Sequence, residues 1–110
     1  MIDWDRVGEL RQEVGEEEFP TVIELFVDEV EQVTRGIAAI SEPAALEEAL
    51  HFLKGSALNI GFRGFAQLCS EGEALAAAGR AEEVDVAAIL ACYAQSKAHF
   101  LSESGADLAG

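Results

Sequence analysis

Hydrophobic side chains recur every three or four positions along most of the chain, whereas the alternation typical of strands is not sustained anywhere. In segment 2–14 this spacing predicts a short first helix, which Gly15 interrupts. Four longer amphipathic helices are predicted at residues 18–40, 43–60, 62–79 and 82–104. The expected fold class is therefore all-α.

Residues with special backbone preferences mark the expected helix ends. Pro20 and Pro43 suit the first turn of a helix, where a missing N–H is not needed. Ser41 is expected to cap the segment that begins at 43, and Gly61 to end it. Because the connections are short, neighbouring helices must pack antiparallel. This predicts an up-down-up-down four-helix bundle with the short extra N-terminal helix capping one end and Trp4 covering the open end.

Composition narrows the class of protein. The chain has 110 residues, of which 50% are hydrophobic, and we expect a single domain over residues 1–110 with a frayed tail at 105–110. A net charge of −14 disfavours nucleic acid and anionic membranes as partners. No signal-peptide pattern and no apolar run near the roughly 20 residues of a membrane span are present. We therefore expect a cytoplasmic, monomeric, stand-alone module.

A single histidine lies in the segment 43–60, and helical geometry predicts which way it faces. At about 100° per residue, the apolar positions of this segment cluster about 150° away from His51. Those positions are Leu46, Ala49, Leu50, Leu53, Ala57 and Ile60. The imidazole is therefore expected to face solvent.

The neighbours of this histidine on its own face suggest a docking surface. Glu47 and Glu48 lie one turn before it, Lys54 and Gly55 one turn after it, and Leu58 two turns after it. A glycine in an exposed helix interior costs about 1 kcal/mol relative to alanine. Its missing side chain would let another protein approach the ring, and Leu58 would offer that protein an apolar contact. In the alternative interpretation the histidine is only solvated, and Lys54 pairs with one of the two glutamates.

The residue types suit acceptance of a phosphoryl group. An exposed imidazole titrates near pH 6.5, so at neutral pH much of it is neutral and nucleophilic. A phosphoryl group on it would add about two negative charges, which Lys54 is close enough to offset. Glu47 and Glu48 should oppose the phosphate, so we expect them to bond elsewhere or to keep the ring protonatable. No Gly-rich phosphate loop or GK[ST] motif accompanies the histidine. The chain is therefore expected to be a phosphoryl acceptor and not an enzyme.

The stretch "HFLKGSALNIGF", residues 51–62, resembles the signature of histidine-containing phosphotransfer (HPt) domains. That signature is roughly H-x-L-K-G-S-A-x-x-x-G on the second long helix of a four-helix bundle. It is matched by His51, Leu53, Lys54, Gly55, Ser56, Ala57 and Gly61. The following "FAQLCSEGEAL" is similar to the next helix of the family, in which a leucine-cysteine pair and a later glutamate are usual. Gly72 departs from the pattern, because the family more often has a large apolar residue there.

The resemblance implies a mechanism. His51 would accept a phosphoryl group from the aspartyl phosphate of a response-regulator receiver domain, or from a sensor histidine kinase, and pass it to another receiver aspartate. Lys54 would stabilise the phosphoryl charge. The receiver would bring Mg²⁺, so no cofactor is expected in this chain. The predicted partner-binding residues are Gly55, Leu58, Glu47, Glu48, Ser56, Asn59 and Arg63. For Arg63, contact with a partner and plain solvation are equally compatible with the sequence.

One alternative function comes from a different class. The bundle could act only by docking or dimerising, without phosphorylation, in which case His51 is incidental. The lysine and glycine beside the histidine favour phosphotransfer. A metal enzyme is disfavoured because no second ligand follows His51 at the i+4 spacing. His99 is expected to be structural, Cys69 to lie in the core, and Cys92 to be no nucleophile because it lies at the edge of the apolar stripe without a nearby base.

Overall fold

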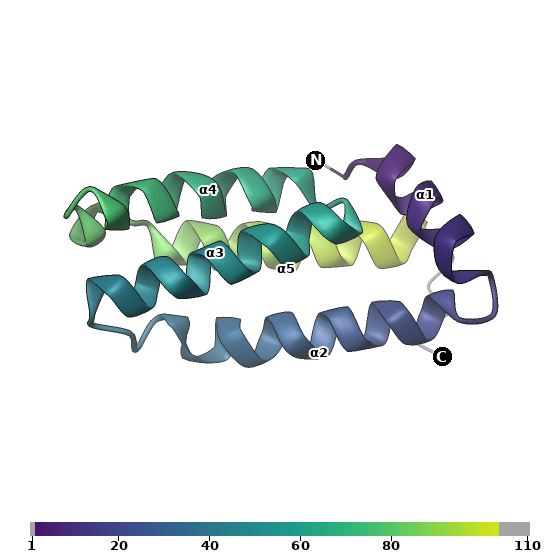
Figure 1. Ribbon diagram of the computed structural model, residues 1–110, viewed down its shortest axis with the longest axis horizontal. Helices are drawn as coiled ribbons and strands as arrows, with labels where there is room; N and C mark the ends of the chain where they lie inside the picture. Colours follow the sequence, from purple (N-terminus) through teal and green to yellow (C-terminus); the bar gives the residue numbers. More distant parts are fainter. Residues whose placement is uncertain (1, 104–110) are drawn as a thin grey trace.

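The computed structural model describes residues 2–103, and these residues form helices and turns with one isolated bridge. In chain order the elements are α1 (Trp4–Val14), α2 (Phe19–Ile37), α3 (Pro43–Ile60), α4 (Arg63–Ala77), the short 3-10 helix η1 (Ala81–Glu83) and α5 (Val86–Glu103). The long helices α2 to α5 run lengthwise, each antiparallel to the one before, and α1 lies across one end (Figure 1). The predicted four-helix bundle with a short extra helix is confirmed.

Several predicted boundaries are wrong by a few residues. α2 ends at Ile37 instead of 40, because the chain leaves the helix through i→i+3 turns in which the N–H groups of Ala39 and Ile40 donate. α4 spans 63–77 instead of 62–79. α5 begins at Val86 instead of 82, where the Asp85 carboxylate accepts a hydrogen bond from the N–H of Ala88 at 3.0 Å. This capping aspartate is a start signal that the periodicity alone did not reveal.

The start and end of α3 follow different rules. Ser41 is not the cap: Glu42 precedes the first helical residue, and no side chain caps the helix. Pro43 occupies the first turn, which leaves one fewer N–H group in need of a partner. At the other end Gly61 adopts a left-handed conformation, with φ of 92°, and its N–H bonds the carbonyl of Ala57. The predicted role of Gly61 is confirmed.

Gly61 also joins the N-terminal segment to the α3–α4 turn. The N–H of Asp3 donates to the carbonyl of Gly61 at 2.7 Å, and Ile2 pairs with Phe62 in the isolated bridge. A Cβ atom at residue 61 would lie 2.8 Å from the carbonyl oxygen of Asp3. Only glycine therefore fits both the backbone conformation and the close approach, and α1 is held firmly beside the end of α3.

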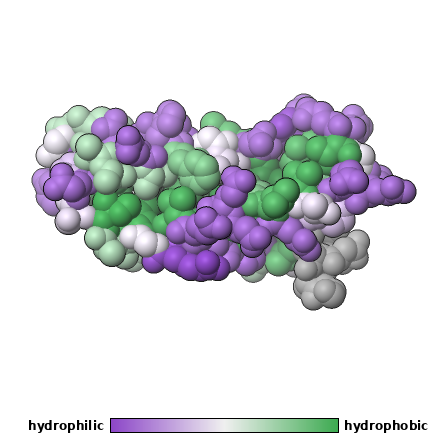
Figure 2. All heavy atoms as spheres, turned by 60° about the horizontal axis from the view of Figure 1, so that its bottom comes forward, coloured by the Kyte–Doolittle hydropathy of each residue, from purple (hydrophilic) through white to green (hydrophobic). Residues whose placement is uncertain are grey.

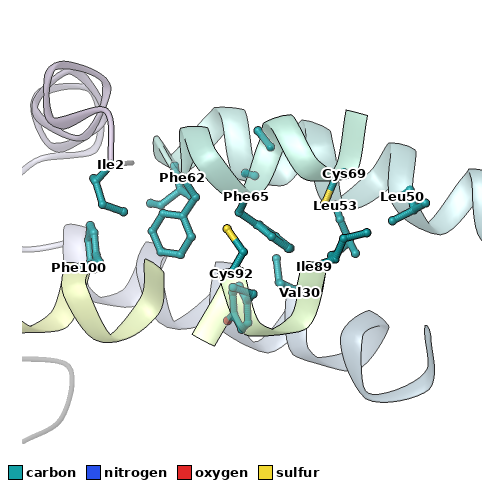
Figure 3. Packing of buried hydrophobic residues seen from close by; sticks show 14 of the residues in the cluster. Ile2, Val30, Leu50, Leu53, Phe62, Phe65, Cys69, Ile89, Cys92 and Phe100 are labelled. Carbon is teal, nitrogen blue, oxygen red and sulfur yellow. The ribbon is translucent and has the colours of Figure 1, made fainter. Parts of the chain in front are cut away.

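Residues from all five α-helices fill the core. Aromatic and aliphatic side chains form a continuous column, in which Phe62, Phe65 and Phe100 are almost completely buried (Figure 3). Cys69 lies in this core as predicted, and burial raises the pKa of its thiol to about 12. Cys92 is also buried, contrary to its predicted place at the edge of the apolar stripe.

Trp4 and His99 lie together at the end of the bundle beside α1. Trp4 stacks on Phe100 with ring centroids 5.8 Å apart, so it covers that end as predicted. His99 lies against the same indole, 6.0 Å away. The predicted helix end at residue 104 and the predicted fraying of 105–110 lie outside the described residues.

A charged cluster joins α2 to α5. The carboxylate of Glu31 accepts hydrogen bonds from the Tyr93 hydroxyl at 3.0 Å and from the Lys97 ammonium at 2.6 Å. Lys97 holds the pKa of Glu31 below its usual range, although partial burial opposes the shift.

The face that Figure 2 brings forward has hydrophilic side chains between separate hydrophobic areas. The apolar surface on that side is thus divided by charged and polar groups.

Candidate functional site

His51 lies on the outer face of α3, and 69% of its side chain is exposed. Its neighbours Leu50 and Leu53 are completely buried on the opposite face of the same helix. The orientation derived from the helical spacing is therefore correct. The ring stands at the surface, where another protein can reach it.

A carboxylate from the adjacent helix holds this ring. Oε2 of Glu73, on α4, lies 2.8 Å from Nδ1 of His51, and Oε1 of the same residue lies 2.7 Å from Nζ of Lys54. Glu73 is mostly covered, with 18% of its side chain exposed, and Lys54 is 28% exposed. One carboxylate thus bridges the imidazole and the ammonium. The alternative in which Lys54 pairs with Glu47 or Glu48 is wrong.

The charge of Glu73 determines which tautomer the neutral ring adopts. Lys54, and then His51, hold the pKa of Glu73 below its usual range against the opposing effect of desolvation. An ionised carboxylate can only accept hydrogen bonds, so Nδ1 of His51 must carry the proton that it donates. In the neutral ring the lone pair then resides on Nε2. Nε2 is therefore the ring nitrogen whose lone pair the contact with Glu73 leaves unused.

Glu73 was not singled out from the sequence, although a usable signal was present. The resemblance placed a glutamate late in this helix, and the segment holds both Glu71 and Glu73. Glu73 follows the buried Cys69 by four positions and so lies about 40° from it around the helix, whereas Glu71 lies about 160° away. Glu71 is exposed and accepts a hydrogen bond from Gln67 at 3.4 Å. The position relative to the buried stripe distinguishes the two glutamates.

Gly72 lets α4 lie close to its neighbours beside the histidine. A Cβ atom at this position would lie 3.0 Å from Cδ1 of Leu50 and 3.2 Å from Cγ1 of Val84. There is no room here for the large apolar residue that is more usual in the family. Leu50 and Val84 fill the space that a larger side chain at residue 72 would need. The close contact at Gly72 thus fixes the position of α4 at the residue directly before Glu73.

On the C-terminal side of His51 the surface forms a shallow groove of about 660 Å³. Gly55 lies in it, and a Cβ atom there would meet no atom within 4 Å. Leu58 lines the same groove and is 55% exposed, so its predicted exposure is confirmed. Phe52, 38% exposed, also lines it and was not predicted from the sequence. Packing within the chain therefore does not require a glycine at residue 55, and its missing side chain widens the groove.

On the N-terminal side of His51 the surface is acidic. Glu47 and Glu48 line a second depression, of about 650 Å³, together with His51 and Glu73. Within residues 2–103 neither Glu47 nor Glu48 forms an ion pair. The two sides of the imidazole thus differ in character, one carboxylate-rich and one apolar.

The remaining predicted residues lie farther along α3 or on α4. Ser56 is half-buried and lines the groove. Asn59 is engaged by Arg6 of α1, which donates to its carbonyl oxygen at 2.9 Å and to its side-chain oxygen at 3.0 Å. Arg63 is exposed at the start of α4, ten positions or about 15 Å along the helix from Glu73. The structure therefore does not bring Arg63 to His51.

Residues 2–103 were also compared with the requirements of a metal site and of a membrane-spanning helix. No group of three or more His, Cys, Asp or Glu side chains in this part of the chain is arranged to hold a metal ion. Within the same range, no helix combines the length and the apolar character that crossing a bilayer requires.

Comparisons with known proteins place these features in a family. Neither the comparison with curated proteins nor the comparison with solved structures gave a match. The family model described as Hpt domain matches residues 21–107, which include most of α2, all of α3 to α5 and the whole histidine site. Hpt domains carry phosphoryl groups in two-component relays and interact with kinases and response regulators. Because the match covers most of the chain, the protein belongs to the Hpt domain family.

Proposed function

We propose that this protein is a phosphoryl carrier in which Nε2 of His51 accepts a phosphoryl group from the aspartyl phosphate of a receiver domain and returns it to another receiver aspartate. A sensor histidine kinase is the alternative donor. The observation that carries the proposal is the exposed imidazole whose Nδ1 is held by the ionised carboxylate of Glu73. A solvated, incidental histidine would need no such partner.

The transfer step follows from this arrangement. The Nε2 lone pair attacks phosphorus, the P–N bond forms, and the P–O bond to the receiver aspartate breaks, so the aspartate leaves as a carboxylate. The ring keeps its Nδ1 proton and becomes a positively charged N-phosphoimidazole. Glu73, 2.8 Å from Nδ1, stabilises that positive charge. In the reverse step the electron pair of the P–N bond returns to Nε2.

Lys54 supplies the complementary charge. Its ammonium rests on Glu73 at 2.7 Å and lies one turn along α3 from His51. The incoming phosphoryl group carries about two negative charges. Lys54 can share its three donors between Glu73 and the phosphoryl oxygens, and this would stabilise both the transition state and the phosphorylated ring.

The receiver domain would supply the metal ion for the transfer. As the family resemblance implies, we propose that Mg²⁺ arrives with the receiver domain and that this chain holds no cofactor of its own. Gly55, Leu58, Ser56 and Asn59 would form the contact surface on one side of the ring. We further propose that the protein acts as a monomer in the cytoplasm, where its two free thiols stay reduced.

A transfer assay tests the proposal. Receiver domains from the same genome are phosphorylated with labelled acetyl phosphate and incubated with the full chain. Label is expected on the wild-type protein and on the His99→Gln variant, which keeps His51, and none on His51→Gln. Transfer that survives His51→Gln would contradict the assignment. Binding of receivers without any transfer would favour the alternative, a docking or dimerising module.

A further inference from the structure

The helix α1 lies outside the residues that match the family, yet it contributes to the groove beside the histidine. The contributing side chain is Arg6, which shares the groove with Phe52, Gly55 and Leu58 of α3. Its side chain is 23% exposed. The surface next to His51 is thus built from two helices.

The guanidinium of Arg6 is fixed by four acceptors. Nε and one terminal nitrogen donate to Asn59, and the other terminal nitrogen donates to Glu9 at 3.2 Å and to Glu13 at 3.3 Å. The Asn59 carbonyl lies in the last turn of α3, where carbonyl groups lack partners within the helix. A cation is favourable at this end of a helix. Arg6 therefore anchors α1 in a defined place at the end of the groove.

The cluster that Arg6 forms with Glu9 and Glu13 beside the groove has a net negative charge. Arg6 contributes one positive charge, and Glu9 and Glu13 contribute two negative charges. Both glutamate side chains remain largely exposed, at 65% and 59%. The groove thus has an apolar floor at Phe52 and Leu58, and at its α1 end the lining residue Arg6 holds two carboxylates that lie outside the lining itself. The surface complementary to it has an apolar side chain with a basic residue beside it.

We propose that α1 forms one wall of the receiver-docking groove, and that Glu9 and Glu13, positioned by Arg6, contact a lysine or arginine of the receiver domain while an apolar receiver side chain packs on Phe52 and Leu58. This proposal rests on the proposed function, because the occupant must reach His51 at the same time. The groove is continuous with the histidine surface, which favours the receiver as its occupant. In this arrangement α1 selects among receivers but takes no part in the chemistry.

The experiment separates docking from chemistry. In the double variant Glu9→Gln/Glu13→Gln, the amide oxygens still accept from Arg6, so α1 stays in place while two charges are removed. With acetyl-phosphate-loaded receivers as donors, we expect KM to rise about threefold to tenfold at low salt with unchanged kcat. Phosphorylation of the chain by phosphoramidate, which needs no docking, should remain at the wild-type rate. About 0.5 M salt should abolish the difference.

The matched control is Glu42→Gln/Glu82→Gln, which removes one charge directly before α3 and one in η1. The start of α3 and the end of α4, which η1 follows, lie at the end of the bundle away from α1 (Figure 1). An equal KM for the two double variants would overturn the role of α1 while leaving the proposed function intact. Absence of transfer from every receiver to the wild-type chain would overturn both proposals. A dimer of the wild-type chain that dissociates on Leu58→Ser, measured by sedimentation, would show that a second copy is the occupant and would also overturn the proposal.

Discussion

Gly55 offers a test in which stability and activity should change in opposite directions. The residue is exposed in the interior of α3, and a Cβ atom there would contact nothing within 4 Å. Replacing it with alanine should therefore give the full gain in helix propensity, about 1 kcal/mol. With an unfolding entropy of about 2.1 cal/mol/K per residue, this gain raises the Tm of a chain of this length by about 4 °C. Thermal unfolding followed by circular dichroism measures the shift.

A larger side chain at residue 55 should weaken the binding of a receiver domain. Gly55→Gln retains most of the stability gain, but its side chain would occupy the groove one turn from His51. A receiver that packs on Phe52 and Leu58 would be displaced, so we expect its affinity to fall about tenfold or more, which corresponds to about 1.4 kcal/mol. Titration of the variant with a receiver, monitored by calorimetry or by transfer kinetics, measures this loss.

Gly8 provides the matched control. It is also an exposed helical glycine at which an added Cβ atom would meet nothing within 4 Å, and it lies on α1 away from the side of Arg6. Gly8→Gln should stabilise the fold in the same way and leave receiver affinity unchanged. The reasoning about Gly55 is refuted if Gly55→Gln binds receivers as tightly as Gly8→Gln does.

Four other variants test the remaining contacts. Lys54→Ala should slow transfer about tenfold or more with intact helicity, because one charge-assisted contact is lost; an equal loss of helicity by circular dichroism would point to a structural role. Glu73→Gln should also slow transfer, most clearly at neutral pH, without unfolding the chain; an unchanged rate would remove Glu73 from the mechanism. Gly72→Leu should lower stability by about 1 to 3 kcal/mol in urea unfolding through overpacking against Leu50, and full stability would show that the space is larger. Glu31→Gln should cost about 1 to 2 kcal/mol at pH 7. Because the folded pKa of Glu31 is depressed, the wild type has this contribution above about pH 4.5 and loses it as the pH falls through the folded pKa, so the two proteins should converge in acid.

Features that depend on one helix at a time could be predicted from the order of the residues. Helical periodicity indicated the four long helices, and short connections indicated their antiparallel arrangement. The same periodicity placed His51 opposite the buried leucines, and a left-handed glycine ended α3 at Gly61. These features are local, since backbone geometry and the spacing of apolar residues define them without reference to any other helix. Local signals were weaker at the ends: the cap expected at Ser41 was wrong, and the 3-10 turn before α5 was not foreseen.

Which residue of one helix lies opposite which residue of another depends on the packing of the whole bundle. Helical periodicity gives the face of each side chain, but the register between α3 and α4 depends on how closely they pack at Gly72 and on the left-handed turn at Gly61 that joins them. This register places Glu73 between His51 and Lys54. In the same way, the contact of Arg6 with Asn59 spans 53 positions and depends on where the Gly61 turn holds α1. The sequence of α3 therefore determines the exposed histidine and its lysine, whereas the contacts from Glu73 of α4 and Arg6 of α1 form only when the bundle folds.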